Sequence, residues 1–97
     1  MNFGKRVYEL CMKIPKGKVS TYGEIAGKMK TKGYRAVGNA LNKNKFKEVP
    51  CHRVVASNGH LCGFAGGLKK KAELLRKEGV EVRAFRVDLK RFLYKFR

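Results

Sequence analysis

The chain has 97 residues, 43% of them hydrophobic, and its 24 Lys and Arg against 7 Asp and Glu give a formal net charge of +17 at pH 7. This length and composition predict one globular domain over residues 1–97 and exclude a disordered chain, and no apolar run approaches the roughly 20 residues that a membrane-spanning helix needs. So large a positive charge predicts a polyanionic partner, most simply nucleic acid, although charge alone does not separate DNA from RNA or from an anionic membrane surface. The first residues do not open onto an apolar signal-peptide core, so we expect a cytoplasmic protein associated with the nucleoid.

The cysteine and histidine pattern argues against a disulfide framework and against a metal site. The chain has three cysteines, an odd number without a secretory signal, and lacks a Cys-x-x-Cys pair. His52 and His60 show no zinc-like spacing with any of the cysteines. We therefore predict no structural metal and no cofactor.

The N-terminal half reads as three short helices. Residues 3–14 carry one amphipathic stripe that ends before Pro15. A second helix starts at Thr21, which has capping-box spacing with Glu24, and fades near Lys30. The stripe of the first helix consists of Phe3, Val7, Leu10, Cys11 and Ile14. Since Cys11 lies inside this stripe, we expect it to be a core residue.

A third helix is expected over residues 34–43, after a glycine-containing turn. Its inner face holds Val37 and Leu41, whereas Arg35 and Asn39 share another face. Gly38 lies in the helix interior, where it costs about 1 kcal/mol relative to Ala, which suggests close approach of another group to the backbone. The second and third helices together are a helix-turn-helix candidate, although many such pairs bind nothing.

The middle of the chain holds Cys51 between Pro50 and the pair His52-Arg53. Residues 54–56 read as a short buried strand that leads into a turn at residues 57–59. Pro50 fixes its own φ, so Cys51 sits at a stiff corner, and its basic neighbours favour a thiolate. The alternative is that Cys51 is an inert, buried small hydrophobe.

The remaining elements are a glycine-rich loop, a helix, a short strand and a last helix. The helix covers residues 68–78, with Leu68, Ala72 and Leu75 inward and Gly79 as its stop. Residues 80–84 are expected to form a strand, and Asp88 to cap the last helix. The apolar stripe of that helix comprises Leu89, Phe92, Leu93 and Phe96. The run of lysines at positions 69–71 is expected to be a solvated face.

Several stretches together are similar to one known family. They are residues 14–26 (IPKGKVSTYGEIA), 35–38 (RAVG), Asn44, residues 50–55 (PCHRVV), 63–68 (GFAGGL) and 78–79 (EG). The chain resembles, from about Phe3 to Gly79, the DNA-binding and active-site domain of the O6-alkylguanine-DNA alkyltransferases. It does not resemble that family's N-terminal ribonuclease-H-like domain. The implied fold is mostly α with short strands, a winged helix-turn-helix-like alkyltransferase C-terminal domain, which we expect to be a monomer.

The resemblance implies a single-turnover DNA repair enzyme. An O6-alkylguanine would be flipped from duplex DNA and its alkyl group moved irreversibly to Cys51. The family pattern assigns activation of the cysteine to His52 through a water, orientation of the imidazole to Glu78, and a hinge role to Asn44. Without the resemblance, Glu78 would read as an exposed residue at a helix end.

The resemblance also implies contacts to the minor groove of double-stranded DNA. Arg35 would fill the space that the flipped base leaves, and Tyr22 would press on the neighbouring phosphate. The residues expected to contact DNA are Tyr22, Arg35, Ala36, Gly38 and Asn39. The residues expected to line the base pocket are Pro50, Val55, Phe64, Ala65 and Gly66, the first two through their backbone.

Three departures from the family pattern keep alternatives open. Phe64 and Ala65 stand where many members have tyrosine and serine, which removes possible hydrogen-bond donors to the departing guanine. Lys45 follows Asn44 in place of the common proline. One alternative is a lesion-binding protein of the alkyltransferase-like type, which signals without transfer. Such proteins typically have another residue in place of the cysteine, so the presence of Cys51 argues against this alternative. An ordinary helix-turn-helix nucleoid protein with an inert cysteine is the other.

Overall fold

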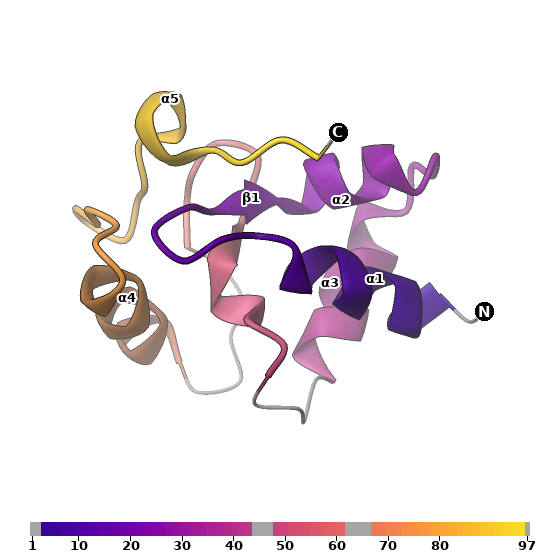
Figure 1. Cartoon of the computed structure of the whole chain (residues 1–97), viewed down its shortest axis with the longest axis horizontal. Helices are drawn as coiled ribbons and strands as arrows, with labels where there is room; N and C mark the ends of the chain where they lie inside the picture. The colour runs from indigo at the N-terminus through magenta and orange to yellow at the C-terminus, as the bar shows by residue number, and fades with distance from the viewer. Residues whose placement is uncertain (1–2, 44–47, 62–66, 97) are drawn as a thin grey trace.

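The protein is a mostly helical fold with a short two-stranded sheet, which confirms the expected fold class. The computed structural model describes residues 3–43, 48–61 and 67–96 (Figure 1). The elements, in chain order, are α1 (Phe3–Met12), β1 (Ser20–Thr21), α2 (Tyr22–Lys28), α3 (Tyr34–Asn42), the 3₁₀ helix η1 (Cys51–Arg53), β2 (Val54–Val55), α4 (Leu68–Lys77) and α5 (Leu89–Phe92). Helices α1–α3 gather on one side of β1, with α4 and α5 on the other (Figure 1).

The first three helices follow the predicted pattern closely. In α1, Val7, Leu10 and Cys11 are buried, whereas Phe3, the first residue of the predicted stripe, is 37% exposed. The helix ends two residues early, and Ile14 enters the core from a tight turn before Pro15. Thr21 caps α2, since its Oγ1 accepts a hydrogen bond from the backbone N–H of Glu24 at 3.0 Å. Val37 and Leu41 form the buried face of α3.

The sheet joins segments that lie far apart in the sequence. Strands β1 and β2 are parallel, with Ser20 opposite Val54 and Thr21 opposite Val55. On the other side of β1, Val19 bridges Leu93, and the N–H of Tyr94 donates to the carbonyl of Val19 at 2.7 Å. The C-terminal segment therefore runs along β1 as an additional extended stretch.

The C-terminal quarter departs from the sequence-based expectation. Asp88 caps α5 as predicted, but the helix ends at Phe92, because Leu93 turns extended to reach Val19. The predicted helical stripe through Phe96 is therefore wrong. Residues 80–84 are not a strand either; Arg83 and Arg86 instead close a tight turn between them.

Helix α4 faces inward differently from the prediction. Leu68, expected in the core, is 38% exposed, whereas Lys71, expected on a solvated face, is 0% exposed. The buried residues of α4 are Lys71, Ala72 and Leu75, which lie on one side of the helix and face the rest of the molecule. The predicted inward face of α4 is therefore right at Ala72 and Leu75 and wrong in its first turn, where Lys71 is buried in place of Leu68.

Two apolar clusters form the core. The first lies among α1, α2 and α3 and extends to Val49 and Val54, with Cys51 packed at its edge. The second lies under α4 and the C-terminal segment and includes Val19 and Val55. Since Val54 of β2 belongs to the first cluster and Val55 to the second, β2 connects the two halves of the molecule.

Candidate functional site

Cys51 lies at the start of η1, the turn that leads directly into β2. Its backbone N–H donates to the carbonyl of Val49 at 2.9 Å, and the N–H of Arg53 donates to the carbonyl of Pro50 at the same distance. These two bonds fold the chain into a tight corner, as Pro50 had suggested. The Cys51 side chain is half-buried against the first apolar cluster, so it is both held and accessible.

An ion-pair network stands beside this corner. The Glu78 carboxylate accepts hydrogen bonds from Arg53 Nε at 2.9 Å and from Arg53 Nη2 at 2.5 Å. The third guanidinium nitrogen, Arg53 Nη1, donates to the carbonyl of Ile14 at 2.9 Å. Arg53 thus fastens η1 to the end of α4 and to the turn after α1.

His52 joins the network through Glu78. Its Nε2 lies 3.1 Å from Glu78 Oε1, although the direction of approach is not that of a hydrogen bond. Burial lowers the pKa of His52, and Arg53 and Lys71 lower it further, which together outweigh the opposing effect of Glu78. The imidazole is therefore largely neutral at pH 7, the form that accepts a proton from a thiol.

Glu78 is ionised in this setting. Burial alone raises the pKa of its carboxyl group, but the hydrogen bonds from Arg53 and the closeness of His52 together outweigh burial and lower the pKa below its usual value. The exposed helix-end reading of Glu78 does not hold, because its side chain is only 12% exposed. From the sequence, Arg53 was expected only to favour a thiolate, and its pairing with Glu78 was missed; its position directly after Cys51 and His52 was the available signal.

Two further buried groups surround the site. Lys71 is fully buried on α4, which packs against η1, and its positive charge acts on both His52 and Cys11. Burial raises the pKa of the Cys11 thiol to about 12, and Cys51 raises it as well. Cys11 is therefore a protonated core thiol, whereas Cys51 is the half-buried one.

The residues predicted to contact DNA lie on α2 and α3. Arg35, Ala36 and Asn39 are exposed on α3, opposite its buried Val37 and Leu41. Tyr22 is half-buried at the start of α2, and a Cβ placed on Gly38 would lie 4.0 Å from the Tyr22 ring. Gly38 of α3 thus lies near Tyr22 of α2, and the exposed residues of these two helices are called the α2–α3 face. Their role in binding remains a prediction.

The predicted base pocket is only partly within the described residues. Pro50 is half-buried at the Cys51 corner, and the Val55 side chain is fully buried in the second cluster, so that only its backbone can face a ligand. The predicted site residues Asn44, Phe64, Ala65 and Gly66 lie outside the described part of the chain, as do Lys45 and Cys62.

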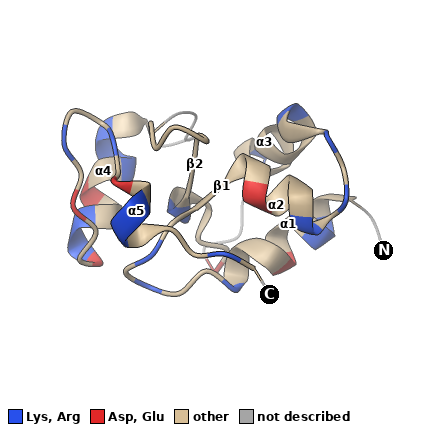
Figure 2. Ribbon diagram, turned by 90° about the horizontal axis from the view of Figure 1, so that it is seen from above, with Lys and Arg blue, Asp and Glu red and all other residues tan. Residues whose placement is uncertain are grey.

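The charge of the molecule is not confined to one helix. Lys and Arg appear on both the α1–α3 side and the α4–α5 side (Figure 2). Within residues 3–43, 48–61 and 67–96, no helix is long and apolar enough to cross a membrane.

The helix pair, the Cys51-His52-Arg53 corner and the glutamate that follows α4 define a known class of domain. The family model described as "6-O-methylguanine DNA methyltransferase, DNA binding domain" matches residues 2–80. The chain therefore belongs to the 6-O-methylguanine DNA methyltransferase family.

Individual relatives agree with this assignment. The chain is 49% identical over 78 residues to a methylated-DNA–protein-cysteine methyltransferase of Methanosarcina mazei, which covers 78% of this chain and 49% of that protein. Its fold is similar to Mycobacterium tuberculosis OGT in complex with DNA, with a TM-score of 0.76, 41% identity and coverage of 81% of this chain and 49% of that one. It is also similar to S. pombe Atl1 in complex with damaged DNA containing O6-carboxymethylguanine, with a TM-score of 0.88, 31% identity and coverage of 99% and 100%. The chain thus spans about half the length of the methyltransferase, whereas it spans the whole of the Atl1 chain.

Proposed function

We propose that this protein repairs O6-alkylguanine in duplex DNA by taking the alkyl group onto Sγ of Cys51. The observation that carries the proposal is the corner itself: a half-buried cysteine followed in the chain by a half-buried histidine, which lies 3.1 Å from a glutamate that Arg53 holds in place. A soft, available thiolate is the nucleophile that attack on an sp³ carbon requires.

The transfer balances within protein and substrate. The Cys51 thiol gives its proton to the neutral His52, and the thiolate attacks the alkyl carbon, forming a C–S bond. The bond between that carbon and guanine O6 breaks, and its electron pair leaves with the guanine, which takes up the proton that His52 accepted and is restored. Since the thioether has no route back to a thiol in this sequence of steps, each molecule acts once.

The exposed face of α2 and α3 supports binding of the damaged duplex. Arg35 and Asn39 are exposed on α3, and the net charge of +17 favours association with phosphates. A guanine in a duplex hides O6 in the stack, so it must be flipped at a cost of a few kcal/mol. Arg35 is the residue that we assign to the vacated space, because its side chain is exposed near the start of α3.

A second function is recognition of the lesion without transfer. It is favoured by the similarity to Atl1, which extends over 99% of this chain and the whole of the other. The transfer reaction is preferred because a sensor has no need of a nucleophile, and Cys51 lies beside a base with an oriented carboxylate.

Intact-protein mass spectrometry separates the two functions. After mixing with duplex DNA that carries O6-methylguanine, the protein should gain one methyl group, about 14 Da, on Cys51. Cys51→Ser should still bind the duplex and gain no mass, whereas Cys11→Ala, which removes the other thiol of the first cluster, should gain the methyl group as the unaltered chain does. An unmodified protein that binds the lesion tightly and selectively would refute transfer and favour the sensor.

A further inference from the structure

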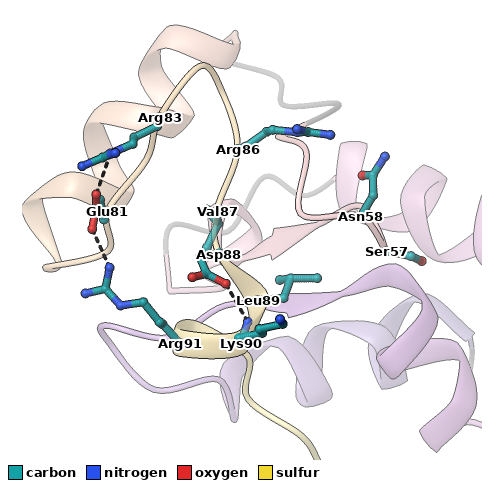
Figure 3. Close-up of a pocket in the computed structure, with 10 residues that line it drawn as sticks. All are labelled: Ser57, Asn58, Glu81, Arg83, Arg86, Val87, Asp88, Leu89, Lys90 and Arg91. Carbon is teal, nitrogen blue, oxygen red and sulfur yellow. Dashed lines mark hydrogen bonds and ion pairs between the residues drawn. The ribbon is translucent and has the colours of Figure 1, made fainter.

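A cavity of about 730 Å³ lies on the α4–α5 side, away from Cys51. The residues around it come from the turn after β2, from residues 81–86 and from the start of α5 (Figure 3). Four of these lining residues are Lys or Arg and two are Asp or Glu, so the cavity is basic. The family model ends at residue 80, so most of the lining falls beyond the part of the chain that it matches.

The tight turn at residues 83–86 forms one wall of this cavity and is rigidly held. Arg83 and Arg86 exchange two backbone hydrogen bonds, at 3.0 and 2.9 Å. Ala84 and Phe85 between them have φ values of 48° and 57°, a left-handed conformation that costs a non-glycine residue about 1 kcal/mol or more. This turn also contacts the segment that follows the turn after β2, because the N–H of Leu61 donates to the carbonyl of Phe85 at 2.8 Å. The surrounding structure therefore enforces a strained backbone that fixes where the two arginines emerge.

The arginines of the cavity differ in their partners. Glu81 pairs with Arg83 at 2.7 Å and with Arg91 at 2.6 Å. The exposed Arg86 guanidinium makes no hydrogen bond or ion pair within the described residues. Figure 3 shows the Arg86 side chain directed away from Arg83 and toward the side where Ser57 and Asn58 lie. Arg86 therefore leaves an uncompensated positive charge beside two polar side chains.

This edge of the cavity adjoins the helix pair. A Cβ placed on Gly23, near the start of α2, would lie 3.4 Å from Ser57 Oγ and 3.6 Å from a ring carbon of Tyr34. Tyr34 begins α3 and directly precedes Arg35. The turn that holds Ser57 and Asn58, toward which Arg86 points, therefore lies beside the starts of α2 and α3.

We infer that Arg86, with Ser57 and Asn58 beside it, binds a backbone phosphate of the same DNA duplex that α3 engages. This inference rests on the proposed function, since it takes the duplex as the occupant of the α2–α3 face. A guanidinium matches a phosphate with two parallel N–H···O bonds, and a contact of this kind fixes the position of the protein on the duplex without reading sequence. The molecule is 35 Å long, and a duplex laid along it spans about 10 base pairs at 3.4 Å each, so phosphates extend beyond the recognition helix.

The test compares Arg86→Gln with Lys13→Gln. Both remove one positive charge from an exposed side chain, but Lys13 lines neither the cavity nor the α2–α3 face. Affinity for a fluorescent duplex with one O6-methylguanine is measured between about 50 and 200 mM salt. Affinity is also measured on two series of shorter duplexes, one trimmed base pair by base pair from one end and the other trimmed from the opposite end. Thermal melting of both variants confirms that they are folded.

Arg86→Gln should bind about 5- to 10-fold more weakly at the lower salt concentration and reduce the slope of log affinity against log salt by about 1. Its deficit should vanish in one of the two shortened series, once the contacted phosphate is removed, while Lys13→Gln stays close to the unaltered protein. Equal affinities and slopes for the two variants on every duplex would overturn the inference.

Methyl transfer by the unaltered protein, read by mass, keeps the two proposals apart. If the protein takes up the methyl group but Arg86→Gln binds DNA as Lys13→Gln does, the proposed function stands and the phosphate site is refuted. If Arg86→Gln weakens DNA binding as expected but the unaltered protein takes up no methyl group, the phosphate site stands and the transfer reaction is refuted. A protein that binds no duplex overturns both.

Discussion

Glu78→Gln should destabilise the protein far more than its place at a helix end suggests. The carboxylate is 12% exposed and holds Arg53, itself 16% exposed, through two charge-assisted hydrogen bonds. An amide keeps one acceptor, but its NH₂ group faces the guanidinium donors. Arg53 is then left with an uncompensated, largely buried charge.

The magnitude follows from the burial of both partners. Breaking a buried ion pair from one side costs about 3–5 kcal/mol, and the residual exposure places this pair at the lower end, about 3 kcal/mol. Each kcal/mol lowers the melting temperature of a domain of this size by about 4–8 °C, so we expect a fall of about 15 °C. An exposed ion pair would cost about 1 kcal/mol or less.

The assay is urea unfolding of a double-mutant cycle made of Glu78→Gln, Arg53→Gln and the double variant. We expect each single variant to be strongly destabilised and the double variant to recover about 2 kcal/mol of the summed loss, because no buried charge is left alone. Glu73→Gln, an exposed glutamate on the same helix α4, is the matched control and should change stability by less than about 0.5 kcal/mol. Additive single effects no larger than that of the control would refute the structural role assigned to the pair.

Two further predictions concern a glycine and the pH. Gly59→Ala should lower the free energy of unfolding by at least about 2 kcal/mol, because the φ of Gly59 is +88° and a Cβ there would clash with the Val87 carbonyl oxygen. Gly27→Ala, where a Cβ would meet nothing within 4 Å, should be neutral or stabilise the protein by up to about 1 kcal/mol. Similar melting temperatures for the two variants would contradict the packing described. Since burial lowers the pKa of His52, the unfolded chain binds more protons below its ordinary pKa of about 6.5, so the unfolding free energy should fall as the pH drops below that value. Urea unfolding at pH 5–8 should show this fall, and it should disappear in His52→Gln but persist in His60→Gln, which alters an exposed histidine. A second fall at more acidic pH should follow from the lowered pKa of Glu78, whose contribution is present above its ordinary pKa and lost as the carboxylate is protonated.

Helices α1 to α3 could be predicted because local signals determine them. The amphipathic stripe of α1 and the Thr21 cap of α2 are contained in neighbouring residues, and the structure confirms both. The short strand after Cys51 was predicted for the same reason, since β-branched residues lead into a turn there. What the sequence could not reveal is that this strand pairs in parallel with Ser20–Thr21.

The errors occur where distant contacts override local preference. Leu93 and Phe96 have helical spacing, but the chain runs along Val19 instead, where the backbones of Phe92 and Tyr94 hydrogen-bond to Val19. Lys71 is charged and follows two exposed lysines, so nothing local predicts its complete burial. The pairing of Arg53 with Glu78 joins residues 25 positions apart, and only the family resemblance had singled out Glu78.

The position of β1 between two remote partners also bears on how the protein is made. The strand at residues 20–21 pairs with residues 54–55 on one side, while its neighbour Val19 bonds to residues 92–94 on the other. A chain emerging from the ribosome can form α1, α2 and α3 early, but the second side of β1 stays open until Tyr94 has left the exit tunnel. Contacts so distant in sequence slow folding, because a long loop must close before they stabilise anything. We therefore expect a ribosome-bound nascent chain halted before residue 93 to be much more sensitive to protease than one followed by a linker long enough to bring Tyr94 out of the exit tunnel.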